Sequence, residues 1–177
     1  MARLLKLCKK NIKIICPVRD VSEILSSFVL LMKENTLKNH ANIFDKEIKV
    51  NNQPITTETR CDLLMKDDGV VRRSLNCIQS AFDSGLNHHL CLVEYQDLIK
   101  NPKETFKKIY NFLEEEYFEH DFENISQFQI ENDLEVYGLE NLHKVRSKLK
   151  STSPDPRMIL TPDILLRCKD MEFWRTI

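Results

Sequence analysis

Glycine is scarce in this sequence of 177 residues, which has only Gly69, Gly85 and Gly138. A loop that cradles a phosphate with backbone N–H groups normally needs several glycines within a short stretch. No such stretch occurs, and the pattern G-x-x-x-x-G-K-[ST] is absent from the sequence. The sequence therefore disfavours a nucleotide kinase or another enzyme that binds phosphate through such a loop.

Paired metal-binding cysteines and long apolar runs are also lacking. No C-x-x-C pair occurs, so we expect reduced thiols, no metal site and no dense disulfide framework. No apolar run is long enough to span a membrane, and lysines interrupt the N-terminal apolar residues before they reach the length of a signal peptide. A cytoplasmic protein is the default expectation. The cysteines stand singly at Cys8, Cys16, Cys61, Cys77, Cys91 and Cys168.

An excess of charge of either sign is absent too. The chain has 26 Lys and Arg against 27 Asp and Glu, and 42% of its residues are hydrophobic. Such a composition is typical of a globular protein and gives no basic field that would indicate a nucleic-acid partner. The length suits one domain over residues 1–177. Any anion-binding site must therefore be a local feature.

The first half of the sequence contains a strand pattern followed by helix patterns. Residues 12–18 form a short apolar run that predicts a buried strand. Asp20 predicts an N-cap with Glu23 in capping-box spacing, so a helix is expected directly after the strand. Residues 35–59 are predicted to be an irregular excursion with one short helix. A further helix is expected between Asp68, as its N-cap, and Gly85 as its C-terminal stop.

The second half begins with the same alternation. Residues 89–95 predict a second buried strand, and Asn101 with Pro102 predicts the start of another helix. Short helices and loops are expected from Gln127 onward. An alternation of strands and helices favours an α/β fold with a parallel sheet. Two strands are too few for such a sheet. Either further strands lie within this sequence, or polypeptide outside it completes the sheet.

The stretch around Arg19 and Ser27 is the best candidate for binding chemistry. Ligands of open parallel sheets bind beyond the carboxyl ends of the strands, which is where Arg19 is expected. Ser27 follows about two helical turns later, so a guanidinium and a hydroxyl could reach one phosphate. The alternative is structural: Arg19 pairs with Asp20 or another carboxylate, and Ser27 caps a carbonyl.

Two stretches resemble one known family. KIICPVRDVSEILSSF is similar to the strand and helix that bind the 3′-phosphate in sulfotransferases dependent on 3′-phosphoadenosine 5′-phosphosulfate (PAPS), although Val21 replaces a usual Pro. LCLVEYQDLIKNPKETFKKIYNFL resembles the next hallmark, a strand ending in Tyr-Glu-Asp-Leu before a Pro and a helix ending in Phe-Leu. Gln96 stands where Glu is common. The resemblance covers roughly residues 13–149.

The resemblance implies four residues that contact PAPS. Arg19 and Ser27 match the pair that holds the 3′-phosphate. Tyr95 matches a tyrosine that contacts the adenine in many members, although as an aromatic residue at a strand end it could equally belong to the core. Arg146 lies in the basic segment 142–150, where the family often places a loop on the same phosphate. The usual Arg-Lys-Gly triplet is absent there, and a solvated helix face is the simpler interpretation of this segment.

The N-terminal part of the family pattern is missing from this sequence. In that family the 5′-phosphosulfate loop and the catalytic base precede the arginine, but the residues before Arg19 contain no such loop, no His and no carboxylate. None of His40, His88, His89 and His143 matches the position of the base. We therefore expect an N-terminally incomplete, three-layer, P-loop-like parallel sheet that lacks the first strand and the phosphate loop. The catalytic residues are unknown.

Two functions from different classes are consistent with the sequence. The first is a sulfotransferase-like protein that moves a sulfuryl group from PAPS to a hydroxyl or amine of an unknown acceptor, such as a sugar, lipid, small molecule or protein, without a metal. The second is a non-catalytic nucleotide-binding remnant or a partner-binding module. An open sheet edge could then accept a strand from a second copy or a complementing chain.

Overall fold

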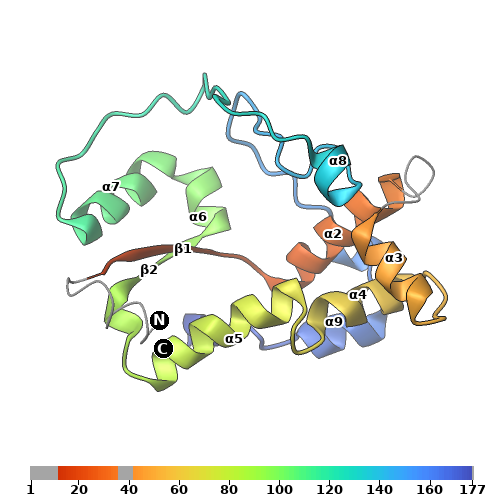
Figure 1. The fold of residues 1–177 in the computed structure, drawn as a ribbon. Coiled ribbons are helices and arrows are strands. Elements are labelled where there is room, and N and C mark those ends of the chain that lie inside the picture. The colour runs from red at the N-terminus through yellow and green to blue at the C-terminus, as the bar shows by residue number, and fades with distance from the viewer. Residues whose placement is uncertain (1–11, 36–41, 177) are drawn as a thin grey trace.

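The fold was obtained as a computed structural model that describes residues 12–35 and 42–176 (Figure 1). Two short strands form a sheet, and helices pack on both of its faces. In chain order the elements are β1 (Ile14–Val18), α2 (Val21–Asn35), α3 (Ile43–Val50), α4 (Thr57–Met65), α5 (Val70–Asp83), η1 (Asn87–His89), β2 (Leu90–Glu94), α6 (Tyr95–Lys100), α7 (Pro102–Leu113), α8 (Asp133–Tyr137), η2 (Pro156–Met158), α9 (Pro162–Cys168) and η3 (Phe173–Arg175).

The sheet is parallel, as the α/β alternation predicts. β1 pairs with β2 in a register that runs from Ile14 opposite Leu90 to Val18 opposite Glu94. Figure 1 shows α6 and α7 on one side of the two strands and α5 on the other, which gives three layers. Within the described residues the sheet contains these two strands and no third. The predicted α/β class with few strands is confirmed.

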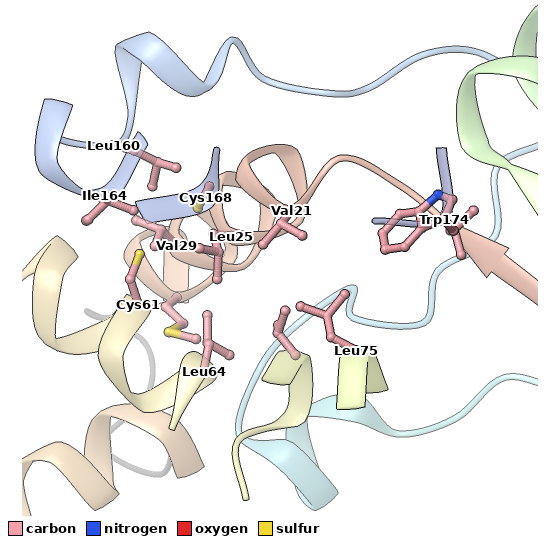
Figure 2. Close-up of a cluster of buried hydrophobic side chains, with 13 residues drawn as sticks. Val21, Leu25, Val29, Cys61, Leu64, Leu75, Leu160, Ile164, Cys168 and Trp174 are labelled. Carbon is pink, nitrogen blue, oxygen red and sulfur yellow. The ribbon is translucent and has the colours of Figure 1, made fainter. Parts of the chain in front are cut away.

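Alternating side chains of β2 divide the interior into two clusters. Cys91 and Val93 pack with Ile109 of α7 in a small cluster. Leu92 points to the opposite face, as the two-residue period of a strand requires, and packs against the main core. That core joins α2, α4, α5 and α9 to the C-terminal tail (Figure 2), through residues that include Val21, Leu25, Val29, Cys61, Leu64, Leu75, Ile164, Cys168 and Trp174.

The N-terminus of α2 is held by acidic side chains. Asp20 accepts hydrogen bonds from the backbone N–H groups of Ser22 and Glu23 at 2.9 and 3.2 Å, so the predicted cap is confirmed. Glu172 from the C-terminal tail accepts the N–H of Val21 at 2.7 Å. The side chain of Glu23 turns toward Arg19, which differs from the capping box that the spacing predicts.

The excursion predicted over residues 35–59 contains more helix than expected. It holds α3, and α4 begins at its end with Thr56 as an N-cap that hydrogen-bonds Thr59. The helix after it begins at Val70 with Gly69 as N-cap, so the prediction of Asp68 as the cap is wrong. A Cβ at Gly69 would lie 2.4 Å from the carbonyl oxygen of Leu64. The close approach of the two helices requires a glycine there.

A buried ion pair joins α3 to α4. Arg60 donates from Nε and Nη2 to the two carboxylate oxygens of Asp45 at 2.9 and 2.7 Å. The side chains of Arg60 and Asp45 are only 4% and 8% exposed. The two parallel bonds are the geometry that a planar guanidinium offers to a carboxylate. This ion pair holds α3 and α4 against each other.

The C-terminal tail closes over the carboxyl end of β2. Trp174 donates its Nε1 hydrogen to Glu94 at 2.9 Å, and Arg175 donates to both oxygens of the same carboxylate. The hydrogen bonds from Arg175 and then Trp174 hold the pKa of Glu94 below its usual value. The tail therefore anchors the strand end that precedes Tyr95. In the described part of the chain no helix is long and apolar enough to cross a bilayer.

Candidate anion-binding site

An open groove of about 710 Å³ lies between the outer face of α2 and the segment 141–154. The α2 wall is mixed, with apolar side chains between the polar positions. The opposite wall brings basic and polar side chains from a part of the chain that is more than 100 residues away. The lining residues are Arg19, Ile24, Ser27, Phe28, Leu30, Leu31, Glu34, Asn141, Leu142, Lys144, Arg146, Thr152 and Pro154.

Arg19 enters the groove from the turn between β1 and α2. Its Nε donates to Glu23 Oε2 at 2.8 Å, and its Nη2 donates to Ser153 Oγ at 2.5 Å. The guanidinium carbon lies 4.4 Å from the centre of the Tyr95 ring, within the range of a cation–π contact. The carboxylate pairing proposed as the alternative for Arg19 is therefore formed with Glu23. Arg19 nevertheless lines the groove.

Ser27 lies on the exposed side of α2 and lines the same groove as Arg19. The spacing of eight residues places both on one side of the strand–helix unit, as the sequence predicts. Within the described residues the Ser27 hydroxyl has no hydrogen-bond partner. Its hydroxyl is thus available to a ligand in the groove.

Tyr95 is the first residue of α6, directly after β2, and its ring lies against the guanidinium of Arg19. Its hydroxyl accepts the backbone N–H of Thr152 at 3.3 Å. Burial acts to raise the pKa of Tyr95, but the hydrogen bonds from Thr152 and the charge of Arg19 outweigh it and lower that pKa. Tyr95 is absent from the groove lining, and its ring orients the guanidinium of Arg19. The contact with adenine stays a prediction.

Arg146 lies on the wall of the groove opposite α2. Its Nη1 donates to Thr152 Oγ1 at 3.4 Å, and Lys144 lines the groove beside it. Residues 142–150 form turns and irregular chain, so the interpretation of this segment as a helix face is wrong. An exposed loop lets both basic side chains reach toward α2. The structure thus brings Arg19, Ser27 and Arg146 to one groove and Tyr95 against Arg19.

Three residues of the site were missed by the sequence analysis: Glu23, Thr152 and Ser153. Glu23 lies four residues after Arg19, and this spacing on a helix start was a usable signal for an ion pair. Thr152 and Ser153 had no such signal, because contacts across more than 100 residues leave no local pattern. Gln96, which replaces a common Glu, donates to Glu23 Oε1 at 3.4 Å.

Among the described residues no histidine lines the groove. His89 instead contacts the carbonyl oxygen of Ile12 through Nδ1 at 2.7 Å, and His88 contacts that of Gly85 at 3.0 Å. Glu34 is the carboxylate found in the described lining. The groove therefore has the donors of an anion site, and the catalytic residues are still unknown.

One group in the described chain has the donor types of a metal site, whereas the sequence predicted none. Donor atoms of Glu131, Asp133 and His143 lie within 4.8 Å of one another. His143 Nδ1 contacts Asp133 at 2.7 Å, and its backbone N–H donates to the same carboxylate at 2.8 Å. His143 Nδ1 also lies 3.2 Å from Glu131 Oε2, so contacts to His143 account for the close approach of the three groups without an ion.

Comparison with known protein families gives a match. The model of the sulfotransferase domain family matches residues 2–158, which is most of the chain. No curated protein and no solved structure matches the chain. The matched range includes Arg19, Ser27, Tyr95 and Arg146, together with the groove segment that carries Ser153.

Proposed function

Because the chain belongs to the sulfotransferase domain family, we propose that its groove binds the 3′-phosphate of PAPS or of the product adenosine 3′,5′-bisphosphate. Arg19 supplies a planar pair of charged donors and Ser27 a hydroxyl, which suit a phosphate monoester. Arg146 adds positive charge from the opposite wall, and Tyr95 contacts the adenine while it orients Arg19. The observation that carries this proposal is that Arg19, Ser27 and Arg146 line one groove.

The reaction that fits this ligand is transfer of the sulfuryl group of PAPS to a hydroxyl or amine of an acceptor. Such a transfer needs positioning of the donor, charge stabilisation on the bridging oxygen and a base for the acceptor. The groove serves the first of these needs, because it holds the end of the nucleotide that does not react. The acceptor is a sugar, lipid, small molecule or protein, and a cytoplasmic location is the accompanying prediction.

The direct test is a calorimetric titration of the full chain with adenosine 3′,5′-bisphosphate. We expect saturable binding that weakens as salt increases, because the contacts are between charges. Adenosine 5′-monophosphate, which lacks the 3′-phosphate, is the matched control ligand and should bind at least about tenfold more weakly, since it forfeits charge-assisted hydrogen bonds. Equal affinity for the two nucleotides, or none for either in folded protein, would contradict the proposal.

A second candidate function is a non-catalytic module that binds a partner strand. The observation behind it is the two-stranded parallel sheet, because parallel sheets are normally larger and covered on both faces. Ile15 on β1 is 42% exposed, and Pro17 beside it is exposed as well. A strand added at this edge would pair with the free backbone groups of β1 and partly cover both side chains.

This second function predicts a dimer or a complex in light scattering of the purified chain, with no sulfate transfer to any acceptor. A second copy and a complementing chain are distinguished by the mass of the complex. A monomer that transfers radiolabelled sulfate from PAPS would rule the second function out and support the first.

A further inference from the structure

The charge of Arg19 is already engaged inside the protein. Arg19 donates to Glu23 and to Ser153, and Ser153 Oγ in turn donates to the same oxygen of Glu23 at 3.0 Å. We call these three side chains the Arg19–Glu23–Ser153 triangle. Arg19 and Glu23 are only 18% and 20% exposed, so water screens their attraction less than that of a surface pair.

A carboxylate and a phosphate use the same donors of a guanidinium. Both accept two N–H bonds in the plane of the group, so an anion that takes the Nε and Nη2 hydrogens must replace Glu23 and Ser153 there. The negative charge of Glu23 also repels any anion beside Arg19. The triangle therefore opposes the binding of the ligand that Arg19 is suited to hold.

The released carboxylate would keep a hydrogen-bond partner. Gln96 at the start of α6 donates its amide hydrogen to Glu23 Oε1, the oxygen that does not contact Arg19. A glutamine at this position is a donor, whereas a glutamate would place a second carboxylate beside the first. Glu23 can therefore turn from Arg19 toward Gln96 without losing all its contacts.

From these contacts we infer that Glu23 is an intramolecular competitor of the anion and sets the affinity of the groove. The inference rests on the proposed function of Arg19 as a ligand of the 3′-phosphate. In the empty groove Glu23 occupies the guanidinium, and the incoming phosphate displaces it toward Gln96. Ser153 is freed by the same step and adds a hydroxyl to the wall that faces the ligand.

A purely structural role of Glu23 would have the opposite effect on binding. If Glu23 mainly held Arg19 in position, its removal would let the side chain move and weaken the complex. Arg19, however, also lies against the Tyr95 ring, a contact that uses none of its N–H donors. Its orientation should therefore survive the loss of the carboxylate, and only the competition should disappear. The sign of the change in affinity separates the two roles.

The test compares Glu23→Gln with the unaltered chain in a titration with adenosine 3′,5′-bisphosphate. We expect binding about tenfold tighter, the effect of removing a competing charge-assisted hydrogen bond. Glu23→Ala is the second variant and should also bind more tightly. Glu104→Gln is the matched control, because Glu104 forms an exposed pair with Lys107 on α7 and should leave the affinity unchanged.

The double variant Arg19→Ala/Glu23→Gln tests whether Glu23 changes the affinity through Arg19. Most of the gain from Glu23→Gln should disappear in it, because the competition is for Arg19 and only the relief of charge repulsion remains. Equal or weaker binding by both Glu23 variants, with unchanged thermal unfolding, would overturn the inference and leave the proposed function standing. No binding by the unaltered chain, Glu23→Gln or Glu104→Gln would overturn the proposed function and the inference together.

Discussion

Replacement of Arg19 by alanine should weaken the binding of adenosine 3′,5′-bisphosphate by roughly 100-fold. Arg19 supplies two charge-assisted donors, and the Tyr95 ring holds the guanidinium in place. The variant also leaves Glu23 beside the ligand without its cation, so repulsion adds to the loss of attraction. Calorimetric titration at one fixed salt concentration measures the change.

Arg157→Ala is the matched control for this variant. Arg157 is an exposed arginine near the far end of the groove segment, and it pairs with Asp155. Its removal should change the affinity by no more than about twofold, as expected for a screened surface charge. Arg19→Lys should fall between the two, because it keeps the charge and loses the planar pair of donors. An affinity of Arg19→Ala equal to that of the unaltered chain would exclude the assigned role.

Replacement of Asp45 by alanine should lower the free energy of unfolding by about 3–5 kcal/mol. The substitution removes the Asp45 carboxylate from a guanidinium that is only 4% exposed, so a buried charge loses this partner. The two hydrogen bonds between Arg60 and Asp45 disappear with it. Urea denaturation followed by the fluorescence of Trp174, the single tryptophan, measures the loss.

Asp62→Ala provides the comparison for Asp45→Ala. Asp62 pairs with Arg167 in the same region, but the side chains of both are about half exposed. Its removal should cost less than about 1 kcal/mol. A similar loss of stability in the two variants would mean that burial does not determine how much these ion pairs contribute to the free energy of unfolding.

Much of the fold near Arg19 could be predicted from sequence because it depends on local patterns. An apolar run predicts β1, and Asp20 predicts the start of α2, where its side chain accepts two backbone N–H groups. Asn101 and Pro102 predict the start of α7 in the same way, and the proline is the first helical residue. Strand and helix starts have chemical signals within a few residues, so one sequence suffices for them.

Features that depend on distant contacts could not be predicted. The helix α4 has little helical periodicity in its apolar residues, because Arg60 occupies a buried position that an apolar residue would otherwise mark. Its partner Asp45 lies on another helix. From Gln127 onward, where the sequence predicts short helices and loops, the exposed Phe128 lies outside any helix. Ser153 reaches Arg19 from 134 residues away.

The distance along the chain between Arg19 and Ser153 has a consequence for protein synthesis. Translation makes Arg19 134 residues before Ser153, and Glu172, which accepts the first N–H of α2, follows later still. Contacts of such long sequence separation form late in folding, after the loop between them has closed. The nascent chain therefore carries Arg19 without the complete groove until the segment 141–154 has been made. A ribosome that stalls before residue 153 releases a polypeptide with the anion-binding arginine but without the wall that faces it.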